Sequence, residues 1–326
     1  MTASSVHRPS GAGDAPAVCG PAAARATGLR KVFGTTVAVD GIDLDVPVGS
    51  VLGMLGPNGS GKTTLIRMLL GLSRPTAGSV ELLGHPVPAA SDRALPHVGA
   101  LVEGPGFHPF LSGRENLRRA AAAEPMLASA DIRAAVGDAL ERVGLRPAAD
   151  RRYRGYSLGM KQRLGLAAAL LVPRRLVVLD EPTNGLDPAG TRDVRRIIGE
   201  LHDGGSTVIV SSHLLAEVEA TCTHVAVLQA GGLVATGELS SLLASGTGGL
   251  VVVTPDVDLA VRTLRETGAT AYRAAGAEPA VVVGEGGPPP PEIIALLVRS
   301  GVAVHEARRR RTNLEELFAQ LTENGS

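Results

Sequence analysis

Apolar and polar residues alternate in two short runs after Leu29, at positions 37–39 and 42–46. Alternation with a period of two is typical of strands with one buried face, as in antiparallel sheets. The next run, Val51–Leu55, carries no charged or polar side chain, and a glycine-rich loop and a helical pattern over residues 63–70 follow it. The pattern predicts an antiparallel sheet, then a buried strand, a loop and a helix.

Two later runs, at residues 176–179 and 207–210, are continuously apolar. Runs of this kind suit parallel strands that are buried on both faces. Residues 112–171 are rich in alanine and periodic in leucine, which predicts helices. The fold class that follows is α/β, with a mostly parallel core and helices on both sides.

The two ends of the chain differ from this core. Residues 1–26 are rich in Ala, Gly, Pro and Ser without a period, which predicts a disordered tail. A loop of two glycines and four prolines at 286–291 interrupts the other end, so residues 246–322 are predicted to form a small α+β appendage. Its expected strands lie at 251–253, 281–283 and 302–304, and its expected helices near 257–267, 291–299 and 313–321.

Charge and hydropathy narrow the function classes. The 326 residues carry a formal net charge of +0, so no nucleic-acid partner is expected. The three consecutive arginines at 309–311 are typical of a face exposed to solvent. Although 44% of the residues are hydrophobic, no stretch approaches the roughly 20 apolar residues that cross a bilayer. The N-terminus lacks a signal-peptide pattern, and two cysteines, Cys19 and Cys222, suit a reducing compartment. We therefore expect a cytoplasmic protein, and any membrane span must come from a partner.

The glycine-rich loop after residue 55 carries the first chemical signal. It fits the phosphate-binding pattern G-x-x-x-x-G-K-[ST] at every fixed position, with the residues Gly56, Pro57, Asn58, Gly59, Ser60, Gly61, Lys62 and Thr63. Lys62 is one of three lysines in a chain that otherwise uses arginine, and its compact charge can reach between the β- and γ-phosphates of a nucleotide. The predicted strand, loop and helix would place backbone N–H groups on the phosphates.

Two further segments carry polar residues beside predicted elements. Asp180 and Glu181 end an apolar strand, where acids face the ligand crevice of a parallel sheet and suit a metal and a catalytic base. Paired acids at this place are also common as loop or helix caps. Ser157 precedes an apolar helix and could bind an anion, although an ordinary helix cap explains it as well.

Taken in order along the chain, these motifs resemble the nucleotide-binding subunit of an ATP-binding-cassette (ABC) transporter over about residues 27–240. The motifs after the phosphate loop are Ser157-x-Gly159 before Lys161-Gln162-Arg163, Asp180-Glu181-Pro182, Asn184-Gly185-Leu186-Asp187 and Ser211-Ser212-His213. The resemblance implies a P-loop NTPase (RecA-like) core with an antiparallel β subdomain and a helical subdomain at about 104–160. It also implies a head-to-tail dimer, in which the phosphate loop of one subunit faces Ser157 and Gly159 of the other across ATP.

The resemblance implies a nucleotide-binding role for several residues. Phe33 matches the aromatic residue that stacks on adenine, although a core phenylalanine explains it equally well from the sequence alone. Lys62 and the loop amides would hold the β- and γ-phosphates, and Thr64 would hydrogen-bond the α-phosphate. Thr63 would coordinate Mg²⁺, so ATP and Mg²⁺ are the expected cofactors.

The same resemblance implies the catalytic roles. Asp180 would support the metal, and Glu181 would be the base that activates water. His213 would contact the γ-phosphate and position Glu181, although an unassisted histidine after a strand is commonly structural. Asp187 would communicate across the dimer.

Three residues depart from the family pattern. Glu103 stands where the family has a glutamine, and we place it with Thr63 and Asp180 among the expected metal-binding residues, although it adds a negative charge beside ATP. Leu158 replaces a glycine and Met160 a glutamine of the usual Leu-Ser-Gly-Gly-Gln. These changes resemble the subgroup of bacitracin, lantibiotic-immunity and daunorubicin-type multidrug exporter ATPases.

Phe107 and Phe110 belong to a chain that has few aromatic residues. The resemblance places them where the cytoplasmic helix of a permease docks, so one hypothesis is an apolar socket for that helix. Packing inside the helical subdomain explains them equally well.

The function that the resemblance implies is ATP hydrolysis coupled to export of a drug, antibiotic or similar compound through a separate transmembrane permease. The subunit would act as a homodimer or heterodimer at the inner face of the cell membrane. A soluble non-transport ABC ATPase of DNA repair or translation is the alternative, but the chain has one phosphate loop, no cysteine pair at metal spacing and no long heptad run. A non-catalytic regulatory cassette fits poorly, because Lys62, Asp180, Glu181 and His213 are all present.

Overall fold

Over the residues that the structure describes, the protein has an α/β architecture with three sheets, one of six strands and two of four. This confirms the predicted fold class. The computed structural model describes residues 22–102, 106–245, 249–274, 278–284, 288–309, 314–315 and 317–318.

The six-stranded sheet forms the centre of the larger part of the chain, here called the main domain, and has the order β10-β9-β3-β8-β7-β6. Neighbouring strands are parallel except for the antiparallel pair β9 and β10. The strands are β3 (Val51–Leu55), β6 (Val98–Leu101), β7 (Leu176–Asp180), β8 (Thr207–Ser212), β9 (His224–Gln229) and β10 (Gly232–Glu238). Strands β3, β7 and β8 are buried along their whole length, as their apolar runs predict.

Helices cover both faces of this sheet, which explains why alternate residues of one strand enter different cores. In β7, Val177 and Leu179 join the core that includes α6 (Pro188–Asp203) and α7 (Leu215–Thr221). Leu176 and Val178 join the opposite core, which includes α1 (Lys62–Leu69). A strand placed between two apolar layers has no polar face, so period-two alternation is absent.

The antiparallel sheet has the order β2-β1-β4-β5, and its strands are β1 (Ala22–Phe33), β2 (Thr36–Pro47), β4 (Ala77–Leu82) and β5 (His85–Val87). The two expected runs at 37–39 and 42–46 form one strand, β2. The predicted tail, residues 1–26, was too long, because β1 begins at Ala22. Ala23, Ala24 and Ala26 of this stretch are buried side chains of β1, and Ala24 pairs with Val46. Residues 1–21 lie outside the described part of the chain.

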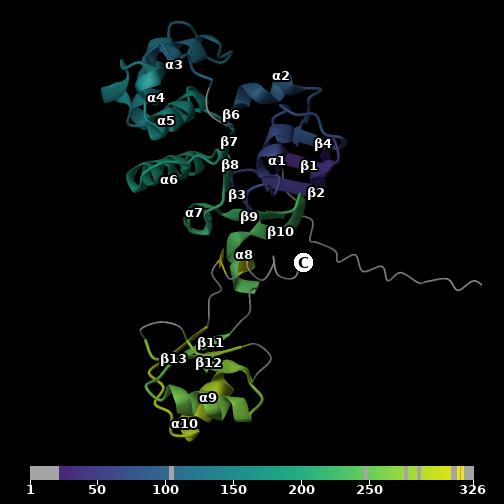
Figure 1. Cartoon of the computed structure of the whole chain (residues 1–326), viewed down its shortest axis with the longest axis vertical. Coiled ribbons are helices and arrows are strands. Elements are labelled where there is room, and N and C mark those ends of the chain that lie inside the picture. The colour runs from purple at the N-terminus through teal and green to yellow at the C-terminus, as the bar shows by residue number, and fades with distance from the viewer. Residues whose placement is uncertain are drawn as a thin grey trace, which may run out of the picture.

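The short helix α2 (Ser91–Ala94) precedes β6. A helical region follows β6 and contains α3 (Gly113–Ala122), α4 (Ile132–Arg142) and α5 (Leu158–Ala169). Figure 1 shows these three helices grouped beyond the β6 and β7 end of the central sheet. Helix α3 begins with a capping box between Ser112 and Glu115. A buried ion pair at 2.5 Å between Glu124 and Arg174 joins the residues after α3 to those before β7.

The two phenylalanines of the segment before α3 differ in burial. Phe107 is half-buried, packs against the core, and meets the ring of Tyr153 edge-on with centroids 5.5 Å apart. Phe110 is 60% exposed, and Arg154 lies against its ring. Phe107 therefore packs inside the helical region, and Phe110 is left available for a partner.

The C-terminal appendage is a βαββαβ unit with an antiparallel sheet of order β12-β13-β11-β14, the ferredoxin-like arrangement. Figure 1 shows it apart from the main domain, beyond α8 (Leu239–Ser245). Its elements are β11 (Leu250–Val253), α9 (Val257–Glu266), β12 (Ala271–Arg273), β13 (Ala280–Val283), α10 (Pro290–Arg299) and β14 (Glu306–Arg309).

One strand of the appendage lies later in the chain than its apolar pattern predicted. Residues 302–304 are not a strand, and β14 starts at Glu306 instead. Val302 is buried in the appendage core, and the backbone N–H of Ala303 donates to Asp256 Oδ2 at 2.9 Å. The apolar side chains that suggested a strand thus fill the core from an extended turn.

The chain returns to the main domain after the appendage. Leu314 and Leu317 are buried in the same core as Leu239, and the backbone N–H of Leu314 lies 3.5 Å from Glu219 Oε2 on α7. The helix expected at 313–321 is described only at residues 314–315 and 317–318. Within the described residues, none of the helices combines the length and apolar character that a membrane span requires.

Candidate active site

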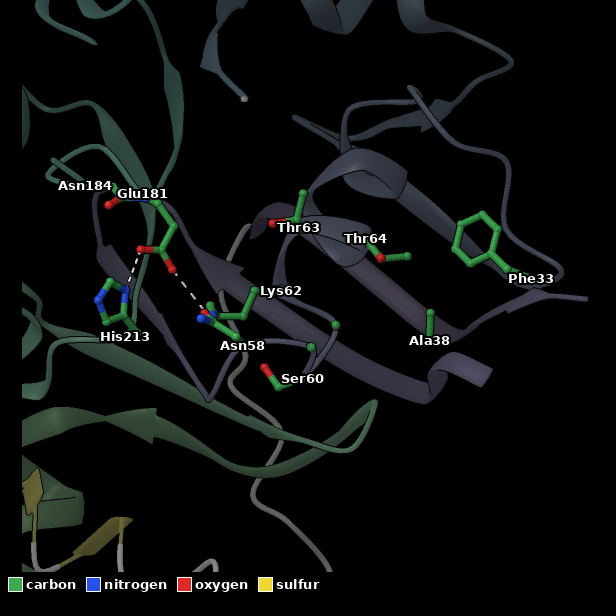
Figure 2. A pocket seen from close by; sticks show the side chains of 12 residues that line it. Phe33, Ala38, Asn58, Ser60, Lys62, Thr63, Thr64, Glu181, Asn184 and His213 are labelled. Carbon is green, nitrogen blue, oxygen red and sulfur yellow. Dashed lines mark hydrogen bonds and ion pairs between the residues drawn. The ribbon is translucent and has the colours of Figure 1, made fainter. Parts of the chain in front are cut away.

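A cleft of about 590 Å³ lies over the loop that joins β3 to α1. Besides this loop, residues from the end of β1, from β2, and from the segments after β7 and β8 form its walls (Figure 2). The residues that line it are Phe33, Ala38, Asn58, Gly59, Ser60, Gly61, Lys62, Thr63, Thr64, Glu181, Asn184 and His213.

The path of the loop depends on two glycines. Gly61 has a φ of 103°, and a Cβ there would lie 2.5 Å from the carbonyl oxygen of Ala38. A Cβ on Gly56 would lie 2.4 Å from the carbonyl oxygen of Leu228. Helix α1 then starts with no side-chain cap and no acidic residue in its first turn. Its first N–H groups and its positive dipole end therefore face the cleft, where they suit an anion.

Lys62 is the cation of this cleft and is 6% exposed. Its Nζ donates to the carbonyl oxygens of Gly56 at 2.7 Å and Pro57 at 3.2 Å, and it lies 3.9 Å from Glu181 Oε1. Burial lowers the pKa of Lys62 below its ordinary value, and the carboxylates of Glu181 and Asp180 oppose that shift. A buried ammonium that is held by loop carbonyls can exchange those acceptors for phosphate oxygens.

The two acids after β7 have different surroundings. Asp180 is buried, and its Oδ1 accepts a hydrogen bond of 2.6 Å from Ser211 on β8. Glu181 projects into the cleft, where its Oε2 lies 2.7 Å from Nδ1 of His213. Dashed lines in Figure 2 mark the contacts of Glu181 with His213 and Lys62. One carboxylate thus lies between an imidazole and an ammonium group.

The backbone of Glu181 is unusual, since its φ is +48°. Its N–H donates to Ser211 Oγ at 2.8 Å, and its carbonyl oxygen accepts from Gln162 Nε2 at 3.2 Å. Ser211 and Gln162 were expected only as members of their motifs, without a role of their own. No signal in the sequence pairs Gln162 with Glu181, because 19 positions separate them.

Phe33 marks the other end of the cleft. Its ring is 50% exposed, and Nζ of Lys31 lies 4.8 Å from the ring centroid. Figure 2 shows Thr64 between the Phe33 ring and the Glu181 and His213 end of the cleft. An exposed ring at the mouth of a cleft leaves a face for a flat ligand group, so Phe33 is not a core phenylalanine.

Several expected site residues lie outside the lining of this cleft. Ser157 caps α5 and accepts from the backbone N–H of Met160, and Gly159 lies in the first turn of that helix. Asp187 caps α6 and accepts from the backbone N–H of Gly190. Glu103 falls outside the residues that the structure describes. Asn184 and Ala38 line the cleft without having been predicted, although Asn184 belongs to a quoted motif.

The donor chemistry of the site fits Mg²⁺. The described residues contain no cluster of three His, Cys, Asp or Glu side chains that could hold a metal alone. Magnesium usually takes one or two carboxylates, waters and substrate phosphates instead of a cage of protein ligands. Thr63 lines the cleft, and Asp180 is buried outside its lining, so a hydroxyl and a carboxylate are present as oxygen donors that would suit such a site.

Comparisons with known proteins agree with this geometry. The ABC transporter family model matches residues 39–184. The daunorubicin resistance ATP-binding protein DrrA3 of Streptomyces coeruleorubidus is 34% identical over 299 residues, which cover 90% of this chain and 94% of that protein. The bacitracin transport ATP-binding protein BcrA of Bacillus licheniformis is 42% identical over 215 residues, 64% of this chain and 67% of that protein.

A solved structure of the ATP binding subunit of an ABC transporter superposes with a TM-score of 0.62 at 25% identity, over 68% of this chain and 92% of that chain. This similarity confirms the predicted P-loop NTPase fold. Because a relative of nearly the same length is more than 30% identical, the similarity extends beyond the phosphate loop to the appendage. The chain belongs to the ATP-binding subunits of ABC transporters, which are ATPases.

Proposed function

We propose that this chain hydrolyses ATP to energise the export of a drug, antibiotic or similar compound through a separate membrane permease. The relatives named for bacitracin transport and daunorubicin resistance support export. The observation that carries the proposal is the meeting of Lys62, Glu181 and His213 in one cleft beside the phosphate loop. Nothing in the cleft favours a non-transport ATPase.

The cleft suits an extended nucleotide. Phe33 at one end would stack on adenine, with Lys31 on the ring adding positive charge. Thr64 would donate to the α-phosphate, and the loop N–H groups with Lys62 would hold the β- and γ-phosphates. In this order the γ-phosphate would lie at the end of the cleft where Figure 2 shows Glu181 and His213.

The chemistry is transfer of a phosphoryl group to water. Glu181 Oε2 would accept a proton from the attacking water while the bond to the leaving oxygen of ADP breaks. His213 would hold this carboxylate through its 2.7 Å contact and would face the γ-phosphate. Lys62 would neutralise charge that develops on the phosphate oxygens. Thr63 and Asp180 would hold Mg²⁺, which when bound supplies further positive charge at the β- and γ-phosphates.

A second copy of the subunit would complete the site. Ser157, Gly159 and Asp187 lie at the starts of α5 and α6 and do not line the cleft of their own chain. In a head-to-tail dimer they would face the nucleotide held by the phosphate loop of the partner. The exposed Phe110 would contact the permease, which would place the subunit at the inner face of the membrane.

The Glu181→Gln variant tests the proposal. Glutamine keeps the size and the hydrogen-bonding capacity of the side chain but is not a base at neutral pH. We expect normal ATP binding, loss of turnover and accumulation of a dimer on gel filtration with ATP. Lys62→Ala is the matched control and should lose binding as well. Near-normal hydrolysis by Glu181→Gln would remove Glu181 as the base, and failure of the subunit to co-purify with any membrane protein would remove the transport role.

A further inference from the structure

We propose that Gln162 is a positioning residue that links the start of helix α5 to the backbone of Glu181. The proposal rests on the proposed function, because it concerns how Glu181 is held for catalysis. The start of α5 consists of residues 157–159, here called the Ser157 segment. Through Gln162, contact of the Ser157 segment with a nucleotide in the partner's cleft would set the position of Glu181 in its own cleft.

The backbone of Glu181 has a conformation that needs support from its surroundings. Its φ of +48° lies in the left-handed region, which is unfavourable for a residue with a Cβ atom. Such a conformation persists only when the surroundings hold it in place, and it is common where strain is part of a mechanism. The position of the carboxylate therefore depends on the contacts that fix both peptide groups of Glu181.

Two side chains make these contacts. Ser211 Oγ accepts from the N–H of Glu181 at 2.8 Å and donates to Asp180 Oδ1 at 2.6 Å. On the other peptide group, the carbonyl oxygen accepts from Gln162 Nε2 at 3.2 Å and from the backbone N–H of Asn184 at 3.1 Å, so Gln162 is the side chain that holds it. A carbonyl oxygen can only accept a hydrogen bond, so the nitrogen of the Gln162 amide must face it. The left-handed turn is thus held from both sides.

The two contacts come from different parts of the fold. Ser211 lies on β8, where it pairs with Asp180 in the register of the central sheet. This contact is therefore part of the same rigid sheet as Glu181. Gln162 lies on α5, which packs against α3 and α4 of the helical region and also against β6, the edge strand of the central sheet. The Gln162 contact is the one that changes when α5 moves relative to the sheet.

Helix α5 also carries the Ser157 segment. Ser157 is its N-cap, so Gln162 lies five residues further, about 7.5 Å along the helix axis. At this spacing the two residues move as one body. In the proposed dimer the Ser157 segment of each copy meets the nucleotide of the other, and its displacement would tighten or loosen the Gln162 contact. Each nucleotide would thereby influence the catalytic base of the opposite cleft.

The first test separates positioning from binding. Gln162→Met keeps the length and bulk of the side chain but removes the donor. We expect kcat at saturating ATP to fall about tenfold, while the Kd for ATP and the thermal midpoint stay close to wild type. Lys161→Met is the matched control on the same helix, because Lys161 contacts the ring of Tyr153 instead of Glu181. It should hydrolyse ATP within about twofold of wild type.

The outcomes of this test are distinct. An unchanged kcat in Gln162→Met would overturn the proposal, and so would a parallel loss of ATP affinity and thermal stability, which indicates packing alone. If wild type itself hydrolyses no ATP in complex with its permease, the proposed function fails instead, whatever Gln162 does.

The second test asks which cleft Gln162 serves. Two copies with different tags are co-expressed, mixed pairs are isolated through both tags, and one copy carries Glu181→Gln, so that a single cleft remains active. Gln162→Met is then added either to the copy that carries Glu181→Gln or to the copy with the intact Glu181. We expect about a tenfold loss when it lies on the copy with the intact Glu181, and no further loss when both changes share one copy. The reverse pattern would show that Gln162 acts on the nucleotide of the partner, which would overturn the proposal.

Discussion

Nδ1 of His213 lies 2.7 Å from Oε2 of Glu181, and this contact joins the ends of two neighbouring strands, β8 and β7. The other oxygen of the same carboxylate lies 3.9 Å from Lys62 Nζ. Glu181 is thus oriented between two groups before any nucleotide enters. His213 is 44% exposed, so the imidazole is free to reach a ligand in the cleft.

Removing the imidazole should therefore reduce catalysis more than binding. We expect His213→Ala to lower kcat about a hundredfold, with the Kd for ATP within about threefold of wild type. His213→Gln, which keeps one hydrogen-bonding group near Glu181, should retain more activity. The measurement is steady-state hydrolysis together with equilibrium nucleotide binding. Equal activity of His213→Ala and wild type would contradict the role of this contact.

Replacing Phe33 should weaken the binding of ATP and leave the rate of the chemical step unchanged. Stacking of a base on an aromatic ring contributes about 1–3 kcal/mol, so Phe33→Ala should raise the Kd for ATP about tenfold or more. The value of kcat at saturation should hold, because the ring lies at the far end of the cleft from Glu181 (Figure 2). Phe33→Trp is the control that restores the stacking surface. Unchanged affinity in Phe33→Ala would place adenine elsewhere.

The close approach of the phosphate loop to β2 makes Gly61 irreplaceable. A Cβ at this position would lie 2.5 Å from the carbonyl oxygen of Ala38, so Gly61→Ala should displace the loop and abolish detectable ATP binding. Gly59 also has a positive φ, of 83°, but a Cβ on Gly59 would have no heavy atom beyond its chain neighbours within 4 Å. Gly59→Ala should therefore weaken binding less. Isothermal titration with ATP compares the two variants, and equal affinities would refute the steric argument.

The ion pair between Glu124 and Arg174 should matter for stability because its side chains are 11% and 6% exposed. Glu124→Ala leaves the guanidinium buried without its acid, so we expect a loss of about 3 kcal/mol in the free energy of unfolding. Glu141→Ala is the matched control, since its pair with Arg146 is exposed, and it should cost less than about 1 kcal/mol. Denaturant unfolding measures both. Similar losses would show that burial of the first pair has no energetic consequence.

Burial raises the pKa of the Cys222 thiol to about 12. In Cys19→Ser protein, at pH 8, about one folded molecule in ten thousand would carry the thiolate, against roughly a quarter of unfolded chains with a pKa near 8.5. Labelling by a thiol reagent should therefore be slow until the protein unfolds. The folded state keeps this proton as pH rises above about 8.5 while the unfolded chain releases it, so this group makes the fold less stable toward high pH. Rapid labelling of native protein would contradict the buried position.

Much of the fold could be predicted because its signals are local. The apolar runs of β7 and β8 carry no alternation because both of their faces are buried. The phosphate loop contains its own geometric requirements, in Gly56 and Gly61. Each of these features depends on a few adjacent residues, so it can be predicted from a short stretch of the sequence.

The sequence-based predictions were wrong where the same apolar pattern is compatible with more than one structure. Alanines at 22–26 resemble a low-complexity tail, yet Ala23, Ala24 and Ala26 are buried in β1, which pairs with β2. Val302 and its neighbours have strand-like alternation but fill the core from a turn. The contact of Gln162 with Glu181 is set by the packing of α5 against the sheet, and no local signal reports it.

Because Leu314 and Leu317 are buried in the same core as Leu239, the ATPase domain is discontinuous along the chain. The βαββαβ unit is in effect an insertion between α8 and the last part of the core. Ending the chain after residue 245 would therefore not give an intact ATPase domain, since it would remove two side chains that are buried in that core and expose their apolar neighbours. A shortened version that keeps its solubility should instead join α8 to residue 314 through a flexible linker.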